Sequence, residues 1–108
     1  MSGSVHISFY ATLFRGDKLH SALEDIAKKS SHFGATAWAV YRYRDDRYKF
    51  LVTFDFDSKA EWDRYWTSQD FLDFRIANQS YYQVPLLYSW TDKSSNETLA
   101  AALAVESH

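Results

Sequence analysis

The side chains of this 108-residue chain that could carry out chemistry are few and scattered. None of the four histidines is spaced to share a metal ion with a second histidine or with a pair of carboxylates. The sequence also has no glycine-rich phosphate loop and no Gly-x-Ser-x-Gly nucleophile turn. We therefore expect no metal site and no cofactor, and the motifs of hydrolases, phosphate-binding loops and dinucleotide-binding enzymes are not present.

His6 is the histidine of greatest chemical interest, because it shares one face of a predicted strand with Ser8 and Tyr10. An imidazole titrates near neutral pH and could act there as an acid or a base. A single titratable group rarely makes a site, however. The plainer interpretation is a histidine at an interface or at a strand edge.

Arg75 differs from the other charged residues because it lies among Phe71, Leu72 and Phe74 in an apolar stretch. A guanidinium in such a place could reach into a pocket and hold a carboxylate or a phenolate. It could equally form a salt bridge at the surface or across a dimer, and both interpretations stay open.

Aromatic side chains make up 19% of the sequence: eight Phe, eight Tyr and four Trp. Most of them must belong to the core, because large rings dominate the core energetics of small domains. Trp66 and Phe71 are candidates for the wall of a small-molecule pocket, although helical spacing also suits plain packing. Tyr81 and Tyr82 precede Pro85 and could form a lid or contact a partner subunit.

The elements that would position these side chains follow from local patterns. Apolar and polar residues alternate from Val5 to Phe14, as in a strand with two usable faces. Asp17 can cap a helix that ends at Gly34. This helix has a regular apolar stripe, formed by Leu19, Ala22, Leu23, Ile26 and Ala27. A strand at 36–44 and a turn at Asp45 and Asp46 lead into a third strand from Tyr48.

The stretch from Phe50 to Phe74 predicts a strand that runs into an interrupted helix. Ser58 can cap the first part, with Glu61 completing a capping box. Thr67 and Ser68 offer a second cap, so we expect the helix to break and restart there. A broken helix over a sheet can leave a pocket. A short fourth strand is predicted at 86–91, after Pro85.

The resulting order, β-α-β-β-α-β, is typical of the α+β ferredoxin-like plait, an antiparallel sheet with both helices on one face. Its other face would be too aromatic to remain in water. A small core also benefits from a second packing partner. We therefore predict a homodimer that forms through this sheet face, which carries Tyr10, Phe14, Tyr41, Tyr43 and Leu51 among Ser8, Thr12 and Thr53.

The chain resembles the dimeric α+β barrel superfamily, and within it the antibiotic biosynthesis monooxygenase (ABM)-like proteins, from about Val5 to Thr91. The resemblance is most specific in Ser58-Lys59-Ala60-Glu61-Trp62 and in Ser68-Gln69-Asp70-Phe71 followed by Phe74-Arg75. It implies two subunits forming a dimeric α+β barrel, each with a pocket between sheet and helices. Several members of this family oxidise polycyclic aromatic compounds with O₂ and no cofactor, and others degrade haem.

The resemblance also suggests site residues. The haem-degrading branch uses an Asn, a Trp and a haem-ligating His, and the matching positions here hold Phe9, Tyr65 and Arg75. Arginine offers iron no lone pair, so haem degradation is disfavoured. The catalytic candidates are Tyr10, Trp62 and His6. The residues we expect to bind substrate are Phe9, Trp38, Phe54, Tyr65, Trp66, Phe71 and Arg75.

Composition limits the partners and the location. A net charge of −2 and a pI near 6.0 provide no basic field for nucleic acid. No apolar run approaches the roughly 20 residues that cross a membrane, and no signal peptide is recognisable, so we expect a cytoplasmic protein without a membrane partner. The absence of cysteine fits a reducing compartment.

We expect one domain at residues 1–92, followed by a polar linker and an Ala-rich, flexible tail at 93–108.

Two functional classes remain. One is a cofactor-independent monooxygenase acting on a small aromatic or polyketide-like compound in a pocket between sheet and helices. The other is a non-catalytic dimer that binds a small hydrophobic ligand or has a structural role.

Overall fold

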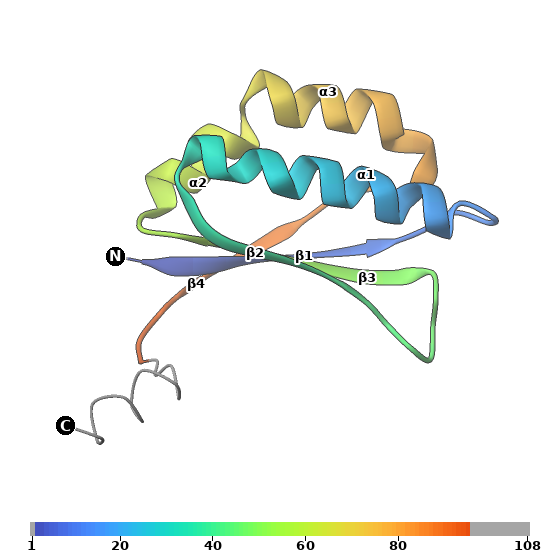
Figure 1. Cartoon of the computed structure of the whole chain (residues 1–108), viewed down its shortest axis with the longest axis horizontal. Helices are drawn as coiled ribbons and strands as arrows, with labels where there is room; N and C mark the ends of the chain where they lie inside the picture. Colours follow the sequence, from blue (N-terminus) through green and yellow to red (C-terminus); the bar gives the residue numbers. More distant parts are fainter. Residues whose placement is uncertain (1, 96–108) are drawn as a thin grey trace.

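The computed structural model describes residues 2–95 as a four-stranded antiparallel sheet with helices along one face (Figure 1). The sheet order is β2-β3-β1-β4. Its strands are β1 (Gly3–Tyr10), β2 (Ala35–Arg42), β3 (Lys49–Phe56) and β4 (Tyr88–Asp92). The helices are α1 (Gly16–Lys29), α2 (Lys59–Trp66) and α3 (Gln69–Asn78), with short 3₁₀ turns η1 (Ser30–Phe33) and η2 (Gln79–Tyr81). The predicted α+β, ferredoxin-like fold is confirmed.

The two central strands form the floor of the core because their apolar residues alternate toward the helices. In β1, Val5, Ile7 and Phe9 are buried, whereas His6, Ser8 and Tyr10 point to the other face and are exposed. β3 pairs antiparallel with β1, and the register places a buried side chain beside each of these. The buried pairs are Val5 with Phe54, Ile7 with Val52 and Phe9 with Phe50.

The predicted first strand is too long. β1 ends at Tyr10, and the chain then turns, with the Arg15 amide donating to the Thr12 carbonyl at 3.0 Å. Phe14 has φ 64°, in the left-handed region, and its side chain is 85% exposed. The apolar alternation continues through the turn and conceals the strand end. Thr12 and Phe14 are therefore not part of the sheet face, contrary to the prediction.

Helix α1 buries its predicted stripe, in which Leu19, Leu23, Ile26 and Ala27 face the sheet and Ala22 is half-buried. The expected cap is wrong, because Asp17 lies inside the first helical turn. Its carboxylate instead accepts from Nη1 of Arg42 at 2.8 Å, which lowers the pKa of Asp17. This ion pair joins the start of α1 to the end of β2. Gly34, with φ 98°, ends the helical segment after η1, as predicted.

The predicted break between α2 and α3 is confirmed. The Ser58 hydroxyl accepts from the Glu61 amide at 3.3 Å, and the Ser68 hydroxyl accepts from the Phe71 amide at 3.2 Å. Each cap satisfies a backbone N–H that has no partner within its helix. The restart lets α3 bury Phe71 and Phe74 while α2 buries Trp62 and Tyr65.

The second face of the sheet is left uncovered by the described residues (Figure 1). Tyr10 and Tyr41 are exposed there by 41% and 55%. The same face carries Asp55, whose carboxylate accepts from the Ser4 hydroxyl at 2.5 Å and lies 3.5 Å from Nζ of Lys93. The division into a domain at 1–92 and a tail at 93–108 stays a prediction, since residues 96–108 lie outside the described part of the chain.

Candidate functional site

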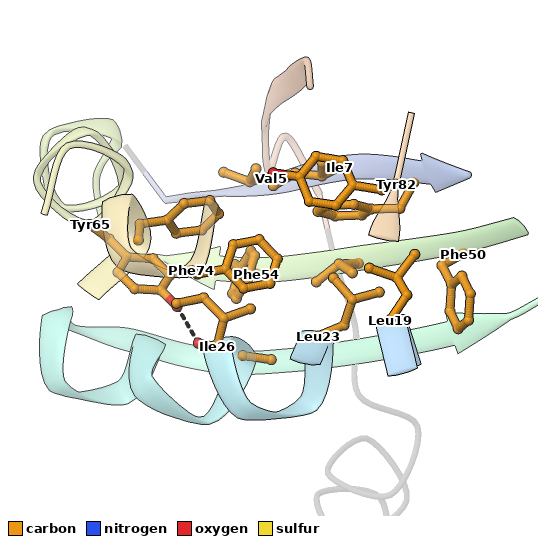
Figure 2. Close-up of a cluster of buried hydrophobic side chains, with 14 of the residues drawn as sticks. Val5, Ile7, Leu19, Leu23, Ile26, Phe50, Phe54, Tyr65, Phe74 and Tyr82 are labelled. Atoms are coloured by element: carbon orange, nitrogen blue, oxygen red, sulfur yellow. Dashed lines mark hydrogen bonds between the residues drawn. The ribbon is translucent and has the colours of Figure 1, made fainter. Parts of the chain in front are cut away.

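Aromatic rings and aliphatic side chains together fill the space between the sheet and the helices (Figure 2). Trp62 and Tyr65 have no exposed surface, and Phe54 stacks on Trp62 with 5.7 Å between ring centroids. Phe71 meets the edge of Trp62 at 6.1 Å. Rings in these geometries attract one another in addition to burying area. Between Trp62, Tyr65 and the sheet, the structure is therefore a packed core.

Tyr65 is held in this core by its hydroxyl, which donates to the Ile26 carbonyl of α1 (Figure 2). Burial raises the pKa of Tyr65, so the phenol is neutral and acts as a donor that links α2 to α1. Trp62 also has a buried polar atom in this core, its indole Nε1, which has no hydrogen-bond partner among residues 2–95. Neither group is positioned to contact a solvent-borne substrate.

The three catalytic candidates do not come together. His6 and Tyr10 lie on the uncovered face of the sheet, whereas Trp62 is buried on the helix side. The Tyr10 hydroxyl donates to Oδ2 of Asp46 at 2.7 Å, and this bond raises the pKa of Tyr10. A phenol with a raised pKa is a poor base at neutral pH. The sheet thus separates His6 and Tyr10 from Trp62.

A cavity of about 360 Å³ lies beside α3, next to the ring-filled core. It opens between α3 and the segment that leads to β4. Arg75 and Tyr82 contribute its polar groups, together with Gln79. Its apolar wall consists of Leu72, Ile76, Val84 and Leu86.

Arg75 is half-buried at this cavity, and its guanidinium lies on the face of Trp66, 4.4 Å from the ring centroid. Nη2 donates to the Trp66 carbonyl at 3.1 Å. Nε is fully enclosed and has no partner within residues 2–95, where Arg75 also has no carboxylate within salt-bridge distance. The stacking fixes the position of the guanidinium, and no carboxylate among the described residues forms an ion pair with it.

Tyr82 forms the inner wall of the cavity and is 4% exposed. Its ring meets Phe9 edge-on at 5.3 Å and stacks on Phe74 at 6.1 Å. Burial raises the pKa of Tyr82, and the positive charge of Arg75 partly opposes this increase. Tyr82 is thus a neutral phenol within electrostatic range of the guanidinium.

The predicted substrate-binding residues fall into three groups. Arg75 lines the cavity, Trp66 and Phe71 contact its guanidinium, and Phe9 supports Tyr82 from behind. Phe54 and Tyr65 lie deeper in the core. Trp38 lies on β2, at the edge of the sheet opposite β4, and is 38% exposed.

Sequence reasoning did not assign Leu72, Ile76 or Val84 to the site, and it considered Tyr82 only as part of a lid or of a contact with a partner subunit. A signal for Tyr82 was present, because Tyr81 and Tyr82 lie shortly before Pro85, the only proline of the sequence. Leu72 and Ile76 lie at positions i and i+4 of α3, and both remain exposed, by 42% and 69%. Apolar side chains at that spacing normally face a core. The exposure of Leu72 and Ile76 beside a cavity identifies them as site residues, and this exposure cannot be read from the sequence.

A second cavity, of about 710 Å³, is a groove between α1 and α3. Its rim mixes acidic and basic side chains, including Asp25, Asp73, Lys18 and Lys29. None of the residues predicted for catalysis or substrate binding lines it. This groove is a solvated seam between two helices, and the smaller cavity is the candidate site.

Within residues 2–95, no group of three or more His, Asp or Glu side chains is placed to hold a metal ion. Among the helices described, none combines the length and apolar character needed to cross a membrane.

Solved structures share this fold at low sequence identity. Rv0793 from Mycobacterium tuberculosis matches with a TM-score of 0.78 and 13% identity, over 91% of this chain and 100% of that chain. A Deinococcus radiodurans protein, provisionally named as an antibiotic biosynthesis monooxygenase, matches at 0.78 and 15%, over 91% and 97%. PA3566 from Pseudomonas aeruginosa matches at 0.76 and 16%, over 87% and 95%. No protein-family model and no curated protein sequence matches the chain.

Proposed function

Because the chain has the fold of the antibiotic biosynthesis monooxygenase-like proteins, we propose that it is a homodimer that binds a small aromatic or hydrophobic compound. The ligand occupies the cavity beside α3 in each subunit. The observation that carries this proposal is the combination of an apolar wall with the Arg75 guanidinium in one cavity. Small-molecule sites typically combine an apolar lining with a few polar groups.

The uncovered sheet face supports the homodimer. It presents Tyr10, Tyr41 and the half-buried Leu51 next to small residues such as Ala37 and Ala39. Tyrosine side chains such as these are enriched at protein–protein interfaces. Asp55 would be enclosed in such a dimer, but its contacts with Ser4 and Lys93 already compensate its charge. A cytoplasmic location is part of the same proposal, supported by the absence of cysteine.

A second candidate function is cofactor-independent monooxygenation of the bound compound. Its support is the name of several solved neighbours, which are described as antibiotic biosynthesis monooxygenases. The corresponding reaction converts an aromatic methylene and O₂ into a ketone and water. The contribution of this chain would be to bind the ring and to stabilise its deprotonated form beside Arg75. The candidate catalytic residues Tyr10, Trp62 and His6 lie outside this cavity.

Native mass spectrometry of the purified protein tests the proposal first. We expect a dimer at micromolar concentration and an added mass when an aromatic compound is supplied. A monomer would refute the homodimer, and a dimer that takes up none of a panel of aromatic acids and phenols would refute ligand binding. Oxygen uptake with anthrone separates the two functions. Formation of anthraquinone supports the monooxygenase, and binding without oxygen uptake supports the binding protein alone.

A further inference from the structure

We propose that the cavity beside α3 selects apolar anions, and that Arg75 holds the anionic group, a carboxylate in the first instance. This inference rests on the proposed ligand-binding function and specifies the class of ligand. It follows from three observations on the described residues: an uncompensated charge, a fixed guanidinium and an exposed apolar rim.

The first observation is the uncompensated charge of Arg75. A half-buried cation has lost part of its hydration, and this loss is costly unless an anion compensates it. The acidic residues among 2–95 do not supply that anion. The described surroundings of the guanidinium are the Trp66 carbonyl and the rings of Trp66 and Phe71. An incoming carboxylate would restore the missing partner.

The second observation is the fixed geometry of the guanidinium. Stacking on Trp66 and the bond from Nη2 to the Trp66 carbonyl hold its plane in place. Nε is enclosed, whereas Nη1 is neither enclosed nor hydrogen-bonded within the described residues. The accessible donors therefore lie at the Nη end of the group. A planar carboxylate matches such a pair of donors better than a single hydroxyl does.

The third observation is the apolar rim. Ile76 and Val84 are exposed by 69% and 61%, and Leu72 by 42%. All three line the cavity. An inorganic anion would leave these side chains in water, whereas an apolar acid would cover them. The rim therefore favours an anion with an apolar body of aromatic or branched hydrocarbon.

A carboxylate from the partner subunit is the competing occupant for Arg75. The two possibilities make different predictions. If a partner carboxylate compensates the charge, replacing Arg75 weakens the dimer and leaves ligand affinity unchanged. If a ligand does so, the replacement weakens ligand binding and leaves the dimer intact.

The test compares two bicyclic probes of nearly equal shape, 1-naphthoate and the neutral 1-naphthamide. Binding is measured by titration calorimetry on the full chain and by quenching of tryptophan fluorescence, since Trp66 lies against Arg75. We expect naphthoate to bind the wild type at least about tenfold more tightly than naphthamide, the range of charge-assisted hydrogen bonds. Arg75→Gln should weaken naphthoate by roughly ten- to a hundredfold and leave naphthamide unchanged.

Two variants complete the design. Arg64→Gln removes an exposed arginine of α2 and should change neither affinity. Ile76→Asn should weaken both probes alike, because it alters the rim and not the anchor. Equal binding of the two probes to wild type, or an unchanged naphthoate affinity in Arg75→Gln, overturns the inference while the ligand-binding function stands. Failure of wild type to bind either probe overturns both.

Discussion

Replacing Phe9 by alanine tests whether aromatic rings are what closes the space between the sheet and the helices. Phe9 is 2% exposed and meets Tyr82 edge-on at 5.3 Å and Phe74 edge-on at 6.3 Å. Across the sheet it pairs with Phe50. These neighbours belong to different elements, so none of them can easily fill the vacated volume. The variant should therefore retain a cavity beneath Tyr82.

The magnitude follows from the buried ring. Phenylalanine-to-alanine changes in cores cost about 3–5 kcal/mol, which includes both the lost transfer free energy and the cavity. For a chain of 108 residues the entropy of unfolding is about 0.23 kcal/mol per kelvin. The melting temperature should then fall by roughly 13–22 °C. Small domains have about 5–15 kcal/mol of stability, so the variant is expected to fold at low temperature.

The assay is urea and thermal unfolding of Phe9→Ala at one fixed protein concentration, because dimer formation would make stability depend on concentration. Phe14→Ala is the matched control. It deletes the same ring from a site that is 85% exposed and should change stability by at most about 0.5 kcal/mol. Benzene should raise the melting temperature of Phe9→Ala and not of the wild type. A loss below about 1 kcal/mol in Phe9→Ala, or equal losses in both variants, would refute the reasoning.

Two further predictions concern the same layer of helices. Burial raises the pKa of Tyr65 above the unfolded value of 10.0, so its stabilising effect is complete below pH 10 and is lost as the pH rises toward the folded-state pKa. Above pH 10, Tyr65 should lower the unfolding free energy of the wild type by up to about 1.4 kcal/mol per pH unit. The unfolding free energy of Tyr65→Phe should fall less steeply with pH, because this variant has no phenol to ionise at position 65. At pH 7 the variant should be about 1 kcal/mol less stable than the wild type, because the hydrogen bond is lost. An identical alkaline slope in both proteins would contradict the assignment. Ser68→Ala should cost about 1 kcal/mol in urea unfolding, because the Phe71 amide loses its acceptor, whereas Ser94→Ala should cost nothing measurable.

The parts of the fold that the sequence predicts are those determined by neighbouring residues. Phe50 to Phe56 alternates without interruption, and a strand with one buried face is the simplest structure that satisfies it. Ser58 and Ser68 identify the two helix starts because each hydroxyl accepts an amide only three residues away. The end of β1 was not predicted, because it depends on residues that are distant in the sequence. Ala11 and Leu13 continue the apolar alternation, yet Leu13 and Phe14 form a turn, and the backbone that leads into it is held by Tyr48 and Tyr81, far along the chain.

The candidate site was less predictable because a pocket in this fold depends on small differences in volume. The sequence pattern of Phe9, Phe71 and Phe74 is the same whether the space between sheet and helices is a packed core or a pocket. In the structure this space is filled because the rings contact one another, as Phe9 contacts Tyr82 and Phe74. The cavity persists one step outward, where α3 turns Leu72 and Ile76 away from the core. Arg75 lies between the packed core and the cavity beside α3. Its guanidinium contacts the rings of Trp66 and Phe71 on one side, and the exposed apolar rim of the cavity lies on the other. Its charge is therefore the feature on which recognition of a ligand should depend most.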